Sequence, residues 1–146
     1  MTRSLVACDA TGTPVVPLAH MPDALTANCQ GTAALYQRIG FEPPWIGYVA
    51  VVDGRGVGGG AFVGPPQDGV VEIAYYTLDD EQGRGYATQT AAALVTLARA
   101  HTPDIGLKAY TLMEENASTR ILQRLGFSRV GVAHDADAGD VWEWRA

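Results

Sequence analysis

Two glycines stand where a helix is expected to begin, directly after a β-rich stretch. The segment reads Gln82-Gly83-Arg84-Gly85-Tyr86-Ala87-Thr88 and continues into an alanine-rich run without proline. The first amides of a helix have no partner within it, and its dipole makes that end mildly positive, so anions bind there. Because glycine has no side chain to hold an anion away from the backbone, the amides from Gly83 to Thr88 are expected to wrap a diphosphate.

The glycine turn alone allows other interpretations. One is a turn that uses glycine only to pack a strand closely against a helix, and the turn by itself leaves this open. A P-loop is excluded because no Gly-Lys-Ser/Thr follows. A dinucleotide-binding fold is disfavoured because the preceding strands are expected to be joined by hairpins rather than by helical crossovers.

Motifs at separate places resemble one family. Residues 82–87 fit the Q/R-x-x-G-x-G/A signature of the GCN5-related N-acetyltransferases (the GNAT family). Asn116-Ala117-Ser118, followed by Leu125-Gly126-Phe127, looks like the second motif of that family, and the separation of 34 residues from Gln82 leaves room for one helix and one strand. The phrase Glu72-Ile73-Ala74-Tyr75-Tyr76 is most similar to the branch of ribosomal-protein N-terminal acetyltransferases. The resemblance covers residues 70–131.

The resemblance implies acetyl-CoA (coenzyme A) as cosubstrate. No metal is expected, because the histidines are scattered without the spacing of a metal site, at His20, His101 and His134. The resemblance also implies that the strand near Tyr75, Tyr76 and Thr77 pairs through its backbone with the pantetheine arm, as an added strand does. Asn116, with Ser118 beside it, would hold the cofactor arm or an ordered water. Asn116 is also suited to cap the helix that follows, and the two roles can coexist.

Acetyl transfer to an amine benefits from a base, because an alkyl ammonium with a pKa of about 10.4 is charged at neutral pH. By the resemblance, Glu72 lies beside the thioester and is the candidate general base, directly or through a water; the alternative is a carboxylate that shapes the site by hydrogen bonding. A main-chain N–H near Tyr76 is the candidate oxyanion donor. The tyrosine by which this family often protonates the leaving thiolate is replaced by Leu122. A thiol of pKa about 8.5 leaves tolerably without an acid, and Tyr75, Tyr76 or Tyr110 could substitute, although each is equally explained by packing.

These residues need a scaffold of alternating strands and helices. Residues 21–39 are expected to form two short helices, with a break at Gly31 and a stop at Gly40. The remaining elements follow from periodicity and turn residues. We expect strands over 46–52, 57–63 and 70–78, a helix over 84–99, a strand over 105–113, a helix over 116–126, and a closing hairpin of 127–133 and 141–145.

Composition limits the partners. The net charge of −6, without a cluster of Lys and Arg, argues against nucleic acid, and no apolar run reaches the length needed to cross a bilayer. We read no targeting signal, and Cys8 and Cys29 have no partner motif, so a reduced cytoplasmic setting is expected. The segment HDADAGD, residues 134–140, reads as a hairpin turn, because a calcium loop needs a glycine and a glutamate that it lacks.

The sequence as a whole predicts one α/β (α+β) domain over residues 1–146, with a mixed, mostly antiparallel sheet of about seven strands and helices on both faces. The expected activity is direct transfer of an acetyl group from acetyl-CoA to a primary amine of a small molecule or a protein N-terminus. Two alternatives stay open: a catalytically weak CoA-binding sensor or partner module, and an acyltransferase for a longer acyl-CoA. The acceptor and the oligomeric state, including a homodimer, are also left open.

Overall fold

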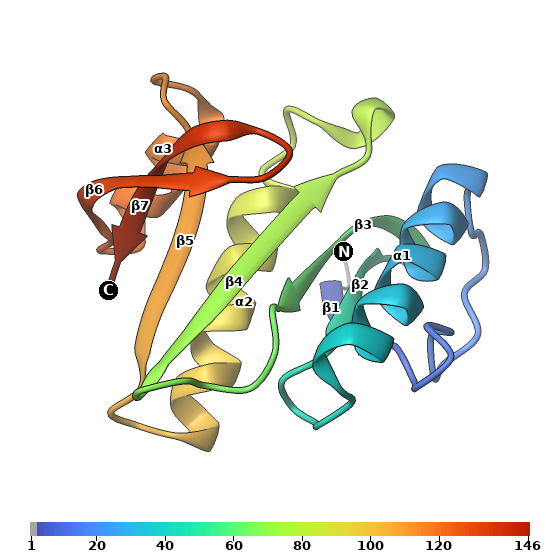
Figure 1. Ribbon diagram of the computed structural model, residues 1–146. Coiled ribbons are helices and arrows are strands. Elements are labelled where there is room, and N and C mark those ends of the chain that lie inside the picture. Colours follow the sequence, from blue (N-terminus) through green and yellow to red (C-terminus); the bar gives the residue numbers. More distant parts are fainter. Residues whose placement is uncertain (1–2) are drawn as a thin grey trace.

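The computed structural model describes residues 3–146, which form one seven-stranded sheet with three α-helices and a short 3₁₀ turn (Figure 1). The strand order across the sheet is β1-β2-β3-β4-β5-β7-β6. The strands are β1 (Arg3–Ala7), β2 (Gly47–Val52), β3 (Arg55–Phe62), β4 (Val70–Thr77), β5 (Gly106–Leu112), β6 (Ser128–Asp135) and β7 (Gly139–Arg145). The helices are α1 (Asp23–Ile39), α2 (Tyr86–His101) and α3 (Ala117–Arg124), and the 3₁₀ turn is η1 (Asp79–Glu81).

Strands β4 and β5 run parallel, and every other neighbouring pair in this sheet is antiparallel. They pair over Val70–Glu72 and Gly106–Lys108 and then diverge, so the sheet opens into a V toward their carboxyl ends (Figure 1). A connection between parallel strands must cross over the sheet, and α2 makes that crossover. The V therefore opens beside the start of α2.

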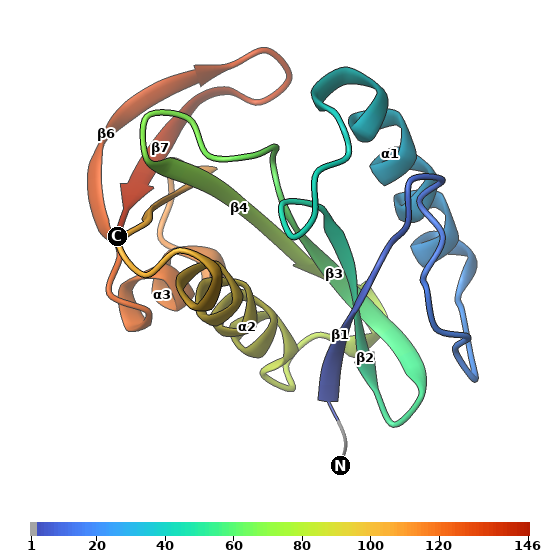
Figure 2. The ribbon, with the colours of Figure 1, turned by 90° about the horizontal axis from the view of Figure 1, so that it is seen from below.

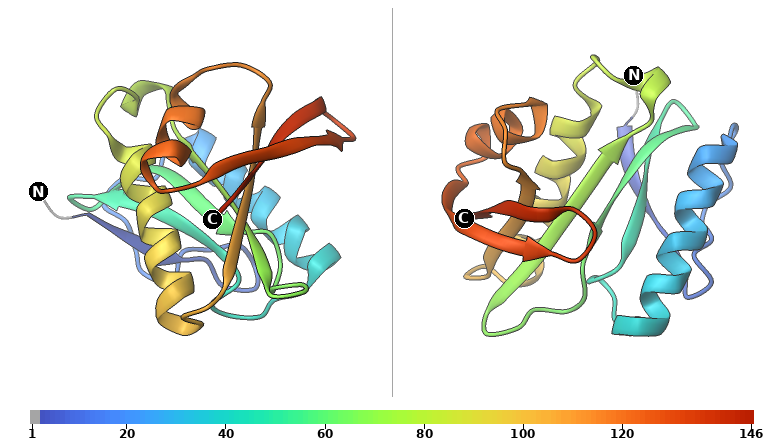
Figure 3. Two further views of the ribbon diagram at one scale, coloured as in Figure 1. Left: turned by 90° about the vertical axis from the view of Figure 1, so that its left-hand side faces the viewer. Right: turned by 45° about the horizontal axis from the view of Figure 1, so that its top comes forward.

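Helices cover both faces of the sheet, as predicted (Figure 2). α2 and α3 lie on one face, where Ile73, Leu94 and Leu107 are fully buried in the larger core cluster. α1 lies on the other face and buries Leu25 and Cys29 against β2 and the end of β4. Further views show α1 and the β6–β7 hairpin standing on either side of β4 (Figure 3). The opened end of β4 is thus reached from both faces.

The prediction of two short helices in residues 21–39 was wrong, because α1 is continuous from Asp23 to Ile39. Glycine in a helix interior costs about 1 kcal/mol relative to alanine. Leu25 and Tyr36, on either side of Gly31, are both buried, and packing of that face outweighs the local cost. Gly40 does end the helix, with a φ of 91° that favours glycine.

Strand β1 was not among the predicted strands. Arg3–Ala7 is five residues long and pairs antiparallel with β2, with Arg3 opposite Val52. A short edge strand depends on its neighbour more than on its own sequence pattern. The other predicted strands and helices are present, and their ends are shifted by no more than two residues.

The closing hairpin also follows the prediction. At its tip the Asp135 carboxylate accepts hydrogen bonds from the amides of Asp137 and Ala138 at 2.8 and 2.9 Å. This is the geometry of a polar turn, as expected for residues 134–140. Elsewhere, Cys8 and Cys29 are buried as free thiols. None of the helices within residues 3–146 is both long and apolar enough to span a bilayer.

Candidate active site

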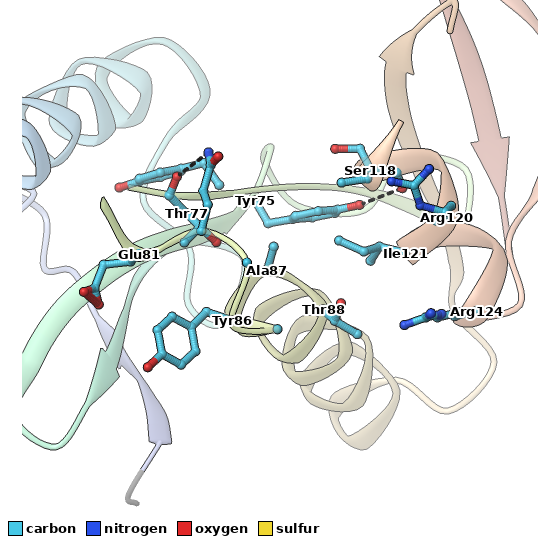
Figure 4. Close-up of a pocket in the computed structure, with 15 residues that line it drawn as sticks. Tyr75, Thr77, Glu81, Tyr86, Ala87, Thr88, Ser118, Arg120, Ile121 and Arg124 are labelled. Atoms are coloured by element: carbon cyan, nitrogen blue, oxygen red, sulfur yellow. Dashed lines mark hydrogen bonds between the residues drawn. The ribbon is translucent and has the colours of Figure 1, made fainter. Parts of the chain in front are cut away.

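A cavity of about 510 Å³, here called the main cavity, lies at the opening of the V (Figure 4). Three segments surround it: the end of β4, the glycine turn with the first turn of α2, and the first two turns of α3. Of the predicted binding residues, those that line it are Tyr75, Tyr76, Thr77, Gln82, Gly83, Gly85, Tyr86, Ala87, Thr88 and Ser118. Arg84 and Asn116 are outside this lining.

The glycines of the turn are required by their backbone conformation. Gly83 and Gly85 have φ values of 80° and 81°, a region that L side chains rarely adopt. A Cβ added at either position would meet nothing within 4 Å. Close packing therefore does not explain these glycines, and the space in front of them is open. Both glycines line the main cavity.

The start of α2 has a glycine where a helix usually has a capping side chain. Gly85 occupies the N-cap position, and by helix geometry the amides of Ala87 and Thr88 have no acceptor within the helix. Glu81 precedes this end and lines the main cavity, but it is paired: Arg55 Nη2 lies 3.0 Å from Glu81 Oε2, and Arg84 Nη1 lies 3.8 Å from Oε1. Its negative charge is thereby balanced, and the helix end keeps its affinity for anions.

The backbone of β4 faces the opening at alternate residues. The Glu72 carbonyl accepts a hydrogen bond from the Val63 amide at 2.9 Å, and the Leu78 amide donates to the Val57 carbonyl at 2.9 Å, so even-numbered residues face the partner strand on the β3 side. Main-chain groups alternate between the two edges of a strand. Those of Tyr75 and Thr77 therefore face the V.

The candidate oxyanion donor is a main-chain amide near Tyr76, and this alternation distinguishes the amides there. The Tyr76 amide points toward Gly59 of β3 and away from the V. The amides of Tyr75 and Thr77 are the ones in position. Thr77 carries a second signal: its hydroxyl oxygen is buried and, within the described chain, has no hydrogen-bond partner. A buried polar atom without a protein partner at the rim of a cavity can bond to an ordered water or to a ligand.

The side chains of Tyr75 and Tyr76 point to opposite faces of the sheet. The Tyr75 hydroxyl crosses to α3 and donates to the Ser118 carbonyl at 3.5 Å (Figure 4). The Tyr76 ring packs on the α1 side, against the cluster that contains Cys8 and Cys29. Burial raises the pKa of Tyr75 to about 12 and also raises that of Tyr76. Both phenols are therefore neutral at physiological pH.

Asn116 caps α3. Its side-chain oxygen accepts from the Thr119 amide at 3.0 Å, and the Thr119 hydroxyl accepts from the Asn116 amide at the same distance, which closes a reciprocal capping box. The capping role expected of Asn116 is therefore present, and its side-chain oxygen is engaged in the cap.

Glu72 lies half-buried on β4, opposite Lys108 of β5. Burial raises the pKa of its carboxyl; Lys108 opposes this rise, and the carboxylates of Asp135 and Glu143 add to it. Glu72 does not line the main cavity. Its side chain lies on the same face of β4 as that of Ala74, and Ala74 is two residues, or about 7 Å, closer to the opening of the V.

A profile described as "Acetyltransferase (GNAT) domain" matches residues 13–128, which is most of the chain. This chain belongs to the GNAT family. No curated protein sequence matched it. The seven-stranded mixed sheet with its three helices is thus the fold of a GNAT acetyltransferase.

Solved structures resemble this GNAT chain in fold. One is described as an acetyl transferase that modifies the N-terminal serine of 50S ribosomal subunit protein L7/L12, from Salmonella typhimurium; it has 20% identity and a TM-score of 0.68, and the match covers 100% of this chain and 95% of that one. Another, the RimL ribosomal L7/L12 alpha-N-protein acetyltransferase in complex with coenzyme A, has 23% identity, a TM-score of 0.64 and coverage of 85% and 71%. The aminoglycoside acetyltransferase AAC(6')-Ib, also with coenzyme A, has 20% identity, a TM-score of 0.59 and coverage of 69% and 65%.

Two residues of this GNAT site were missed by the sequence reasoning. Arg120 and Arg124 lie one turn apart on α3, line the main cavity, and face the start of α2 across it (Figure 4). Their spacing of four residues places them on one helix face, opposite the buried Leu122. This spacing was the signal that could have found them.

Leu122, which stands where the family often has a tyrosine, does not line the main cavity. Its side chain is fully buried in the core cluster beneath α2 and α3. No phenol hydroxyl therefore stands at this position of α3, and a tyrosine that serves the main cavity must come from another element. Of the three tyrosines considered, Tyr75 reaches across the V, whereas Tyr110 lies on β5 near the ammonium group of Lys108, 5.7 Å from its ring centre. With regard to metals, residues 3–146 contain no cluster of three or more His, Cys, Asp or Glu that could hold an ion.

Proposed function

We propose that this GNAT protein transfers an acetyl group from acetyl-CoA to a primary amine by direct attack. The observation that carries this proposal is the junction at the V: an uncapped helix end, two arginines on α3, and the unpaired edge of β4 with its partnerless Thr77 hydroxyl meet at one cavity. These groups fit a long carrier with phosphates at one end and amides along its arm. Because one sheet takes strands from both ends of the chain, we further propose that residues 1–146 act as a single domain.

The diphosphate is assigned to the amides of Gly85, Ala87 and Thr88, where the helix dipole favours negative charge. Arg120 and Arg124 face the same space and add positive charge from α3. The edge of β4 at Tyr75 and Thr77 is assigned to the pantetheine arm, which would pair with the main chain as a further strand. In this arrangement acetyl-CoA supplies the activated acetyl group, and the chain supplies its orientation.

Glu72 is assigned the role of general base, acting through one water. Its raised pKa supports this role, because a carboxylate closer to neutrality is a stronger base at working pH. It would take the proton that the amine loses as the new C–N bond forms. The base acts when ionised, so kcat/KM should rise with pH through the pKa of Glu72, above the range of an ordinary glutamate.

Two further groups serve the reacting centre. The amide of Tyr75 or of Thr77 is assigned to the oxygen that becomes negative as the amine adds. The Tyr75 hydroxyl is assigned to the sulfur that leaves as the C–S bond breaks. With a pKa of about 12 it stays protonated, and because a thiol has a pKa of about 8.5, Tyr75 would stabilise the thiolate by a hydrogen bond rather than by giving up its proton.

A protein N-terminus is one candidate acceptor, supported by the fold-level likeness to a protein described as modifying an N-terminal serine. A small-molecule amine is the other, supported by the weaker likeness to an aminoglycoside acetyltransferase. The Leu122 departure favours a second candidate function, a CoA-binding module with weak catalysis.

The test combines calorimetry with acetyl-CoA and a thiol-release assay over a panel of amines. Acetyl-CoA should bind, and at least one amine should release thiol. The Glu72→Gln variant should lower kcat by about 10²- to 10⁴-fold and remove the acidic limb of the pH profile, with the Kd of acetyl-CoA unchanged. Binding without turnover on any amine would favour the CoA-binding module, and unaltered kinetics in Glu72→Gln would remove Glu72 from the base role.

A further inference from the structure

A second cavity, here called the α1 cavity, lies on the other face of the sheet from α2. It encloses about 270 Å³ between α1 and strands β2, β3 and β4. Tyr75 and Tyr76 line both this cavity and the main cavity, so both cavities border the end of β4. A group in the α1 cavity would therefore adjoin the reacting centre assigned above.

The lining of the α1 cavity is uncharged. Within the described part of the chain, none of its lining residues is an aspartate, glutamate, lysine or arginine. Burial raises the pKa of the Cys8 thiol to about 12 and raises that of Cys29, so both thiols stay neutral. The polar side chains of Asn28 and Thr32 donate to carbonyls of their own helix, at 3.0 and 3.1 Å. What remains for a ligand is an apolar surface.

Carboxylates lie along β4 beyond the α1 cavity, on the side of the β6–β7 hairpin. Glu72 is two residues before Ala74. Its pKa is raised by burial and by the carboxylates of Asp135 and Glu143 on the hairpin, and lowered by the ammonium group of Lys108 on β5. Among Glu72 and these charged groups, carboxylates outnumber cations by three to one. The amine of an acceptor bound between α1 and the hairpin would thus lie toward these carboxylates, and the group next to the amine would lie toward the apolar α1 cavity.

We infer that the α1 cavity receives an uncharged apolar group adjoining the acceptor amine, so that polycationic amines are poor acceptors. This inference rests on the proposed acetyl transfer and narrows its acceptor. Moving an ammonium group from water into an apolar lining without a carboxylate is strongly unfavourable. An apolar group is instead bound in proportion to the area it buries.

Gly31 offers a way to fill the α1 cavity. It lines the cavity, sits inside α1, and a Cβ added there would meet nothing within 4 Å. Leucine is a better helix former than glycine, so Gly31→Leu should raise Tm while occupying the space. Gln30→Leu adds the same side chain at the neighbouring exposed position, which does not line the cavity, and is the matched control.

The probes are two pentapeptides that differ in their first residue, valine or lysine, together with kanamycin as a polycation. In the wild-type protein, the valine peptide should shift the amide resonances of Ala61 and Ala74 and should have a kcat/KM at least about 100-fold above that of kanamycin and tenfold above that of the lysine peptide. Gly31→Leu should lower kcat/KM for the valine peptide at least about tenfold with the Kd of acetyl-CoA within twofold. Gln30→Leu should match the wild type.

The outcomes separate the two proposals. If the valine peptide shifts Ala61 and Ala74 but no probe is acetylated, the proposed activity fails and the apolar site stands. If kanamycin or the lysine peptide is preferred, or if Gly31→Leu turns over the valine peptide as the wild type does, the inference is overturned whatever the activity. If the valine peptide shifts neither resonance, the inference is overturned as well.

Discussion

The two helix ends that face the main cavity are built in opposite ways. α2 begins at Gly85, which has no side chain to cap the first amides, and a Cβ added there would meet nothing within 4 Å. α3 begins at Asn116, whose capping box with Thr119 uses the side chains of both residues. The charges beside them are also arranged differently, because a balanced carboxylate, Glu81, lies near the start of α2.

This difference distinguishes a helix end that can bind an anion with its amides from one that only positions side chains. An end whose amides are already satisfied by a cap has little left for an anion, whereas an end begun by glycine keeps its amides available. α3 instead contributes side chains from its next turn, Arg120 and Arg124, and the carbonyl of Ser118. The presence of a helix N-terminus at a cavity is therefore not enough to assign it an anion.

The largest effect is expected when the open end of α2 is closed by a side chain. Gly85→Ala should raise the Kd of acetyl-CoA about 100-fold, because a loss of about 2.7 kcal/mol corresponds to two charge-assisted hydrogen bonds displaced by a methyl group in the cavity. Calorimetry measures the Kd. The residue has a φ of 81°, so the variant should also lose about 1–2 kcal/mol of stability.

Gly69→Ala is the matched control for that loss of stability. Gly69 has a φ of 76° and open space around it, but it lies in the turn before β4, away from the main cavity. It should lose similar stability and keep its affinity for acetyl-CoA. Equal losses of affinity in both variants would show that backbone strain, and not the closed helix end, weakens binding.

A smaller effect is expected at the side chains of α3. The double variant Arg120→Gln and Arg124→Gln should raise the Kd of acetyl-CoA about tenfold, since partly exposed charges each contribute about 1 kcal/mol or less. The salt dependence of the Kd should become less steep. Isothermal titrations at two salt concentrations measure both quantities, with Arg99→Gln on the last turn of α2 as a control. An unchanged salt dependence would place the two arginines outside the binding site.

The Tyr75 hydroxyl, which contacts the first turn of α3, is proposed to act in catalysis, and its removal tests this role. Tyr75→Phe should lower kcat about fivefold, close to the 1 kcal/mol of an ordinary hydrogen bond, with the KM for acetyl-CoA unchanged. Steady-state kinetics with a thiol-release assay measures this, and Tyr110→Phe on β5 serves as the control. A rise in KM with an unaltered kcat would instead assign Tyr75 to binding.

The smallest expected effect on binding is at the cap itself. Asn116→Ala should cost about 1 kcal/mol of stability and lower Tm by about 2–4 °C, while the Kd of acetyl-CoA stays within twofold. Asn116→Asp retains the accepting oxygen and should restore Tm. A tenfold loss of affinity in Asn116→Ala would mean that this end also reaches the cofactor, and the contrast between the two helix ends would no longer hold.

Much of the scaffold could be predicted because its signals are local. The change from period-two to helical spacing after Thr77 located α2, and Gly40 marked the end of α1. The predicted break at Gly31 was wrong because the low helix propensity of glycine is a local effect. The packing of Leu25 and Tyr36 that outweighs it involves strands distant in the sequence. β1 was missed for the same reason, since its pairing partner lies more than 40 residues away.

The site was predictable in its main chain more than in its side chains. The glycines at positions 83 and 85 indicate, from the sequence alone, a backbone with positive φ, which the structure has at both positions. In contrast, Arg120 and Arg124 matter because α3 happens to face the start of α2, and no single-sequence pattern states which helix faces which. The choice between the Tyr75 and Tyr76 amides depends on strand register, which one residue of slip would invert.

The short pairing between β4 and β5 has a mechanical consequence. Strands β1–β4 and β5–β7 form two half-sheets whose direct hydrogen-bonded junction runs from Val70 to Glu72, with α2 bridging them behind. An acyl carrier bound along β4 at Tyr75 and Thr77 would add contacts between the two half-sheets where they do not pair directly. Saturation at 100 times the Kd would stabilise the folded protein by about 2.7 kcal/mol, and the slowing of amide exchange should be greatest at Tyr75 and Thr77.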